Sequence, residues 1–194
     1  MDTTSRPRRC INLYVLSKGK EKGVTMAGQP KELYGSHLPV LTRLMDVTHG
    51  PVLELGMGLY STPLLHTLCT LQNRFLVSYD SDPVWFEENK KWQNMGHSVI
   101  FVPDDKWEEA QFDEMARHWS IAFVDHKPAK RRKDEIKRLA GIATFVIIHD
   151  TEPESDRYFK YSWMEKYYKY RYQYSKLRPF TSVWSNFVDP IFLF

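Results

Sequence analysis

Short apolar runs alternate with longer amphipathic segments along most of this chain. The runs cover residues 52–55, 75–79, 97–103, 120–126 and 144–150. They are short enough for strands, and most are apolar at consecutive positions rather than at every second one. Strands that are apolar on both faces are typical of a parallel sheet covered by helices on both sides. The pattern therefore predicts a buried sheet of at least five strands.

The segments between the runs have helical spacing. In residues 33–48 the apolar positions include Leu38, Leu41, Leu44 and Met45, and Ser36 is a candidate for the cap at the start of this helix. Further helices are predicted over residues 61–71, 84–95 and 129–141. Strands that alternate with helices in this way predict an α/β, three-layer, Rossmann-like fold with a mostly parallel sheet.

The composition changes after residue 150, where Tyr and Lys become frequent. We expect a helix there, followed by two strands near residues 171–177 and 181–188 that form an antiparallel hairpin at the C-terminal edge of the sheet. Phe159, Trp163 and Tyr167 repeat at every fourth position. That spacing predicts an apolar stripe packed against the sheet.

Length and composition favour one folded domain. The chain has 194 residues, of which 42% are hydrophobic, and we expect a single domain over residues 31–194 after a partly flexible N-terminal arm at residues 1–30. Two cysteines make no disulfide framework. The chain shows neither a signal-peptide pattern nor an apolar run long enough to span a membrane, so a cytoplasmic protein is expected. A net charge of +3 is too small by itself to indicate nucleic acid.

Two glycines follow the first predicted strand, in the stretch ELGMGLYST. In an open parallel sheet, ligands bind beyond the carboxyl ends of the strands. Gly56 and Gly58 would let the backbone approach a ligand closely, and Ser61 and Thr62 begin a helix whose free N–H groups face the same place. A tight connection with no ligand explains two glycines about equally well.

Carboxylates at the next two strand ends favour the ligand. Asp80 ends the second strand, where it could accept hydrogen bonds from a ribose diol. Asp104, Asp105 and Trp107 follow the third strand, where a carboxylate and an indole could meet the amino group and the face of an adenine. These three strand ends therefore offer groups suited to one nucleoside.

Four motifs in this order resemble the class I S-adenosylmethionine-dependent methyltransferases. They are VLELGMGLYST, YDSDPVWFEEN, FVDH and IIHDTE, and they cover about half of the chain. The resemblance implies that Glu54, Gly56 and Gly58 lie at the methionine end of the cofactor, that Asp80 holds its ribose and that Asp105 or Asp104 faces its adenine. The third glycine often present in the family is replaced by Tyr60. The Rossmann oxidoreductase pattern is also incomplete, and no phosphate-binding Gly-Lys-Ser/Thr follows.

Asp125 and Asp150 end the fourth and fifth predicted strands. Neighbouring parallel strands would place their carboxylates close enough to share a divalent cation or to orient an amine or hydroxyl. The two strand ends are similar to those of catechol-type O-methyltransferases, in which the matching aspartates bind magnesium. The resemblance thus implies a possible Mg²⁺ site at Asp125, Asp150 and Thr151, although Thr151 stands where that family commonly has Asn.

Side chains next to these aspartates are candidates for a general base. His126 and Lys127 follow Asp125, whereas strand alternation predicts that His149 points away and packs under a helix. His37 has no partner that the sequence identifies.

The resemblance and the motifs together predict a methyltransferase that acts on an oxygen or nitrogen of a small polar or aromatic molecule. An RNA methyltransferase is the first alternative, because the basic stretch KRRKDEIKR and the Tyr/Lys-rich tail could neutralise phosphates and stack on bases. The second alternative is a non-catalytic module that binds a nucleoside and transfers nothing.

Overall fold

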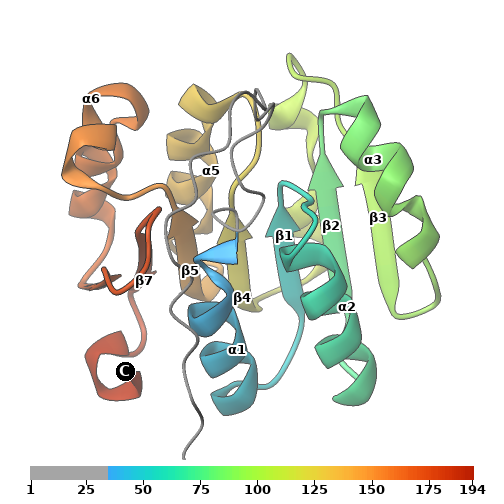
Figure 1. Cartoon of the computed structure of the whole chain (residues 1–194), viewed down its shortest axis with the longest axis horizontal. Helices are drawn as coiled ribbons and strands as arrows, with labels where there is room; N and C mark the ends of the chain where they lie inside the picture. The colour runs from blue at the N-terminus through green and yellow to red at the C-terminus, as the bar shows by residue number, and fades with distance from the viewer. Residues whose placement is uncertain (1–34) are drawn as a thin grey trace, which may run out of the picture. The chain divides into compact units, whose positions relative to one another are not determined.

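Seven strands form one mixed sheet in the order β3-β2-β1-β4-β5-β7-β6. The computed structural model describes residues 35–194 (Figure 1), so the predicted arm at residues 1–30 lies outside the described residues. The strands are β1 (Val52–Leu55), β2 (Leu76–Asp80), β3 (His97–Phe101), β4 (Trp119–Val124), β5 (Ala143–His149), β6 (Tyr170–Tyr174) and β7 (Thr181–Ser185). Strands β1 to β5 are parallel, and β7 pairs antiparallel with both β5 and β6. The predicted Rossmann-like fold with an antiparallel hairpin at the C-terminal edge is confirmed.

Helices cover both faces of this sheet. They are α1 (Leu38–Val47), α2 (Ser61–Leu71), α3 (Pro83–Asn89), α4 (Phe112–Met115), α5 (Arg132–Leu139) and α6 (Asp156–Phe159). Short 3₁₀ segments join them, of which the longest is η6 (Tyr161–Tyr167). None of the helices in residues 35–194 combines the length and the apolar character that crossing a bilayer requires.

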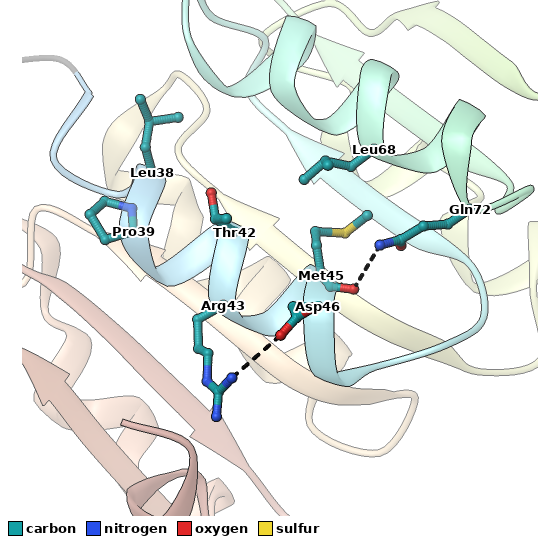
Figure 2. Close-up of a pocket in the computed structure, with 8 residues that line it drawn as sticks. All are labelled: Leu38, Pro39, Thr42, Arg43, Met45, Asp46, Leu68 and Gln72. Atoms are coloured by element: carbon teal, nitrogen blue, oxygen red, sulfur yellow. Dashed lines mark hydrogen bonds and ion pairs between the residues drawn. The ribbon is translucent and has the colours of Figure 1, made fainter.

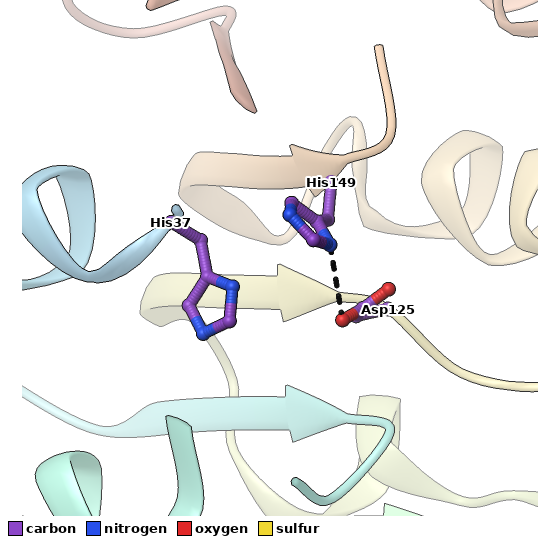
Figure 3. Close-up of side chains that lie close together, drawn as sticks. All are labelled: His37, Asp125 and His149. Carbon is purple, nitrogen blue, oxygen red and sulfur yellow. Dashed lines mark ion pairs between the residues drawn. The ribbon is translucent and has the colours of Figure 1, made fainter. Parts of the chain in front are cut away.

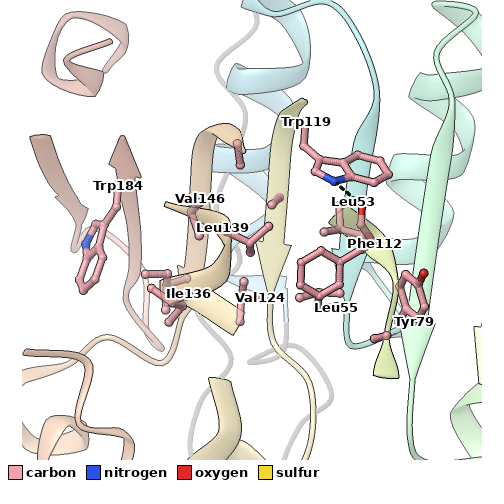
Figure 4. Packing of buried hydrophobic residues seen from close by; sticks show 14 of the residues in the cluster. Leu53, Leu55, Tyr79, Phe112, Trp119, Val124, Ile136, Leu139, Val146 and Trp184 are labelled. Atoms are coloured by element: carbon pink, nitrogen blue, oxygen red, sulfur yellow. Dashed lines mark hydrogen bonds between the residues drawn. The ribbon is translucent and has the colours of Figure 1, made fainter. Parts of the chain in front are cut away.

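Two apolar clusters make up the core, one on each face of the sheet. On one face, α1 and α2 pack on β1, β2, β4 and β5 through residues such as Leu44 and Leu65. On the other face, α4, α5 and η6 pack on the same strands (Figure 4). Successive residues of β4 enter opposite clusters, for example Phe123 and Val124. This alternation explains why the central strands are apolar at every position.

The structure differs from the predicted elements mainly at segment ends. Helix α1 begins at Leu38, because Pro39 occupies the first turn and the preceding residues turn back toward the strand ends. After β5 the chain forms short helical segments instead of one long helix. A 3₁₀ segment does not keep the every-fourth-residue spacing of an α-helix, so the predicted apolar stripe was wrong for Trp163, whose exposed fraction is 59%.

Arg74 links three segments at the end of the sheet where the parallel strands begin. It is 7% exposed, and its guanidinium donates to the carbonyl oxygens of Gly50 (2.7 Å), Thr48 (3.2 Å) and Met45 (3.3 Å). It also donates to the hydroxyl of Ser120 at 2.6 Å. One side chain therefore links the end of α1, the turn before β1 and the start of β4.

We expect Arg74→Met to lower the free energy of unfolding by about 3 kcal/mol, because several buried oxygens lose their donor at once. Urea unfolding followed by circular dichroism measures this loss. Arg43→Met is the matched control, since Arg43 forms an exposed pair with Asp46, and it should cost less than about 1 kcal/mol. Equal losses in the two variants would contradict the role given to Arg74.

Candidate functional site

The polar side chains of interest gather where β1 and β4 end. From β1 the chain proceeds outward to β2 and β3, and from β4 it proceeds the other way to β5. This reversal of strand order makes a topological switch point, at which helices diverge and ligands bind in open α/β sheets.

The turn after β1 requires a glycine at position 56. Gly56 has a φ of +100°, and a Cβ atom placed on it would lie 2.5 Å from the carbonyl carbon of Asp125 and from the backbone nitrogen of His126. A side chain would thus collide with the backbone that follows β4. At Gly58 the φ is not positive and a Cβ would meet only the hydroxyl of Ser61, at 3.3 Å. Of these two glycines, only Gly56 is required by the conformation of the backbone.

Asp80, the last residue of β2, holds this turn. Its Oδ2 accepts a hydrogen bond from the backbone N–H of Met57 at 2.6 Å, and its Oδ1 accepts one from Asp82 at 2.7 Å. The side chain is 3% exposed, and burial raises the pKa of its carboxyl to about 6, against the opposing effect of the two backbone donors. The residue predicted to bind a ribose therefore lies at the predicted strand end and also braces the glycine turn.

Glu54 lies beneath the turn rather than on its surface. It is fully buried and accepts hydrogen bonds from the hydroxyls of Ser78 at 2.6 Å and Thr62 at 3.1 Å. The Thr62 hydroxyl in turn accepts from the backbone N–H of Gly58 at 2.9 Å. Burial raises the pKa of Glu54 to about 7, although its hydroxyl donors act in the opposite direction. Glu54 and Thr62 thus shape the turn from below.

The residues after β3 divide into two groups. Asp104 and Asp105 are exposed beside the strand end. Trp107 is fully buried, and its ring centroid lies 4.0 Å from that of His126 in the core. The prediction that Trp107 offers its face to an adenine was wrong, because the loop turns inward and buries the apolar ring. A pocket of about 420 Å³ opens near this loop, lined by residues that include Tyr79 and Pro103.

Asp125 and Asp150 meet across β4 and β5, as predicted, and a guanidinium lies between them. Arg132 lies 2.8 Å from Oδ1 of Asp125 and 2.9 Å from Oδ2 of Asp150. It also donates to the backbone oxygens of Asp125 and His126. Although burial opposes ionisation, Arg132 and His149 lower the pKa of Asp125 to about 2. Both aspartate side chains keep about a quarter of their surface exposed.

Of the two histidines next to these aspartates, His149 lies at the site and His126 is packed away from it, which is the reverse of the prediction. The Nδ1 atom of His149 lies 3.2 Å from Oδ2 of Asp125 and 3.6 Å from Oδ1 of Asp150. Burial disfavours the charged ring, but Asp125 outweighs it and raises the pKa of His149. His126 is instead buried beside Glu135, 3.4 Å away, and burial lowers its pKa. The structure thus contradicts His126 as an accessible base and His149 as a ring that packs away from the site.

The other predicted neighbours are placed less centrally. Lys127 has an exposed side chain whose Nζ lies 3.6 Å from Oδ2 of Asp82. The hydroxyl of Thr151 accepts a hydrogen bond from Ser182 at 3.0 Å, toward β7. Neither contact directs the side chain at the two aspartates.

Sequence analysis missed Arg132, Ser36 and His37. Arg132 stands in a basic run, but Arg132, Glu135, Ile136 and Leu139 repeat at helical spacing, and all four are buried. That spacing was the available signal. Ser36 does not cap α1 by a side-chain hydrogen bond; its hydroxyl lies 3.0 Å from Nε2 of His149. No sequence pattern indicated that the segment before α1 reaches the end of β5.

A second, shallow pocket of about 640 Å³ lies between α1 and α2 (Figure 2). Its lining combines apolar side chains such as Leu38 and Leu68 with the ion pair of Arg43 and Asp46. None of the residues that gather at the carboxyl ends of the strands lines it, so its size does not make it part of the site.

Comparisons with known proteins agree with this geometry. No protein-family model and no curated protein sequence matches the chain. The solved structures that it resembles include the N-terminal domain of human METTL16 in complex with SAH, with a TM-score of 0.58 and 14% identity over 79% of this chain and 71% of that chain.

Two further similar structures come from bacteria. An O-methyltransferase from Bacillus cereus, in complex with SAH, has a TM-score of 0.54 and 12% identity over 84% of this chain and 83% of that chain. An rRNA methylase from Streptococcus thermophilus has a TM-score of 0.53 and 12% identity over 77% of this chain and 95% of that chain. At these identities the likeness concerns the fold, and the described chain has the Rossmann-like fold of class I S-adenosylmethionine-dependent methyltransferases.

Proposed function

We propose that this protein transfers a methyl group from S-adenosylmethionine to an oxygen or nitrogen of a small polar or aromatic molecule. The observation that carries the proposal is the turn at Gly56, which passes so close to the end of β4 that no side chain fits. It lies at the switch point of the sheet, and Asp80 holds it from the next strand. Similar structures solved with SAH, one of them an O-methyltransferase, support this choice of cofactor.

The cofactor would lie across the ends of β1, β2 and β3. Residues proposed to contact it are Gly56, Gly58, Ser61, Asp80, Asp104 and Asp105. Glu54 and Thr62 act as positioning residues, because their hydrogen bonds hold the turn from its buried side. Cofactor binding would use the backbone of the turn and the carboxylate of Asp80, which accepts hydroxyl donors.

The acceptor would lie against Asp125 and Asp150. The lowered pKa of Asp125 keeps it ionised at neutral pH, and such a weak base removes protons poorly. Its proposed role is to orient the acceptor and to stabilise positive charge on a nucleophile that attacks the sulfonium methyl group. Arg132 fixes both carboxylates, which limits the conformations that the acceptor meets.

We expect Asp80→Asn to weaken binding of S-adenosylhomocysteine by about 10- to 100-fold. The amide has an NH₂ group, a donor, in place of one carboxylate oxygen that would accept a hydrogen bond from a ribose hydroxyl. Isothermal titration calorimetry measures this. In the wild type, affinity should also fall as the pH drops through about 6, since protonation of Asp80 removes the same acceptor.

Asp82→Asn is the control: the Asp82 carboxylate caps α3 by accepting from the backbone N–H of Val84, and an asparagine can do the same. A folded wild-type protein without affinity for the cofactor or its product would end the proposal.

Labelled methyl transfer into a cell extract tests turnover and magnesium together. Arg132 contacts one oxygen of each carboxylate, a histidine nitrogen that suits Mg²⁺ poorly faces the other oxygen of each, and Thr151 is bonded elsewhere. We therefore propose transfer without magnesium at these residues and expect added Mg²⁺ to change the rate by less than about twofold. Asp125→Asn should lower transfer while the affinity for S-adenosylhomocysteine stays unchanged. Binding without transfer to any extract component would favour a non-catalytic module, and strong stimulation by magnesium would contradict the proposed transfer without magnesium.

RNA is the second candidate for the acceptor, because lysines and aromatic rings alternate in space on the basic segment and the tail. Three lysines of the basic segment lie over exposed or half-buried aromatic rings of the tail: Lys130 over Tyr158 at 5.6 Å, Lys133 over Trp163 at 5.9 Å and Lys137 over Tyr167 at 5.2 Å. Cations alternating with aromatic rings suit a single strand of RNA. The likeness to an rRNA methylase adds to this alternative.

If RNA is the acceptor, Trp163→Ala should weaken binding of a single-stranded RNA by about 1–3 kcal/mol, the usual value of one stacked base. Fluorescence anisotropy at several salt concentrations measures the affinity and its salt slope. Lys90→Glu, directly after the end of α3, is the control for a general loss of positive charge. An affinity that is absent, or that does not respond to salt, would exclude this acceptor.

A further inference from the structure

His37 is a buried histidine with unused ligand capacity. It precedes α1, is 3% exposed, and neither of its ring nitrogens has a hydrogen-bond partner among the described residues. Buried polar groups are nearly always paired, so this ring calls for an explanation. A neutral imidazole has one ring nitrogen with a lone pair that can bind a metal ion or accept a hydrogen bond.

The ring of His37 lies beside His149 and Asp125 (Figure 3). One ligand atom from each of the three residues can be chosen so that all lie within 4.8 Å of one another. Neighbouring ligand atoms in a tetrahedral site with bonds of about 2.1 Å lie about 3.4 Å apart. Nδ1 of His149 and Oδ2 of Asp125 are already 3.2 Å apart, and a movement of at most roughly 1.5 Å by the His37 ring brings its nitrogen to the same separation.

The hydrogen bonds around His149 direct its second nitrogen toward Asp125. The hydroxyl of Ser36 donates to the carbonyl oxygen of Pro179 at 2.7 Å, so its contact with His149 at 3.0 Å requires Nε2–H as the donor. Nδ1 then faces Oδ2 of Asp125 across 3.2 Å. A neutral ring would place a lone pair against a carboxylate there, and only a proton or a metal ion relieves that repulsion.

Charge in the cluster favours a cation as well. Asp125 and Asp150 contribute two negative charges, and Arg132 contributes one positive charge. Arg132 uses Oδ1 of Asp125 and leaves Oδ2 to face His149. A proton on His149 would balance the charge but would leave both nitrogens of His37 without a partner, whereas a metal ion would account for both histidines.

We propose that His37, Asp125 and His149 bind a late first-row divalent metal ion such as zinc or iron(II). Two imidazoles and one carboxylate suit these ions, while magnesium prefers oxygen ligands. Ser36 is the outer partner that fixes the orientation of the His149 ring, as such partners do at metal sites. The ion joins the start of α1 to the ends of β4 and β5.

Three protein ligands leave coordination positions open. This inference rests on the proposed methyl transfer. Together they restrict the methyl acceptor to a molecule whose oxygen or nitrogen can bind the metal ion next to Asp125. Metal binding itself is measured without any transfer reaction, so its failure is distinguishable from a failure of the proposed function.

The test is titration of the metal-stripped full-length protein with Co²⁺, followed by its visible absorption, and with Zn²⁺ in competition. We expect one equivalent to bind. His37→Gln should weaken binding by more than about 100-fold, since losing a ligand costs more than losing an outer partner, and Ser36→Ala should weaken it by about 10- to 100-fold. His118→Gln is the control, because His118 precedes β4 at the opposite edge of the sheet and bonds Thr144.

Imidazole ¹⁵N spectra keep the test decisive if a variant folds poorly. Zinc should shift Nδ1 of His149 and one nitrogen of His37 in the wild-type protein. The proposal is overturned if the wild type binds neither ion, if His37→Gln binds as tightly as the wild type, or if His149 remains an imidazolium ring in the presence of zinc.

Discussion

Arg132 joins the ends of β4 and β5, and the arrangement of the site follows from that contact. Its guanidinium is almost completely buried and pairs with both Asp125 and Asp150 while it donates to two backbone oxygens at the end of β4. A buried pair of this kind adds little net stability, because desolvation offsets the attraction, but removal of one partner leaves an uncompensated charge at a cost of about 3–5 kcal/mol. The interaction therefore fixes geometry more than it adds stability. It sets where both carboxylates lie, and through Asp125 it sets where His149 lies.

The carboxyl groups on the two sides of the switch point lie in different electrostatic environments. On the β1 and β2 side, Glu54 and Asp80 are buried among hydroxyl and backbone donors, with no ion pair to a cation within residues 35–194, and burial raises their pKa values to about 7 and about 6. On the β4 and β5 side, Arg132 and His149 keep Asp125 ionised. The carboxylates with raised pKa values are thus those on the side proposed to hold the cofactor. On the side proposed to hold the acceptor, Asp125 stays ionised, and an ionised carboxylate needs to lose no proton before it binds a metal ion.

Much of this site could be predicted because it follows from strand ends. Gly56, Asp80, Asp125 and Asp150 each lie immediately after or at the end of an apolar run, and a parallel sheet brings such positions to one edge. The errors have a different origin. His149 was assigned by alternation along a strand, and His126 was assigned by its position next to Asp125. His126 lies beyond the last residue of β4, and the chain there turns its ring onto Trp107. Trp107 was placed at the rim because it is near a strand end, whereas the loop buries it.

The order of the apolar runs, their length and the residues that end them determined the layered α/β fold and the carboxyl edge as the place of chemistry, since these properties depend on local periodicity and on the geometry of parallel strands. Only the tertiary structure decided which cation meets Asp125 and Asp150 and which histidine faces them. Arg132 comes from α5, and Ser36 and His37 come from the segment before α1, more than a hundred residues from His149. The contacts of Ser36 and His37 with His149 join such distant segments that they depend on how side chains pack across the whole domain, and no local pattern of residues encodes them.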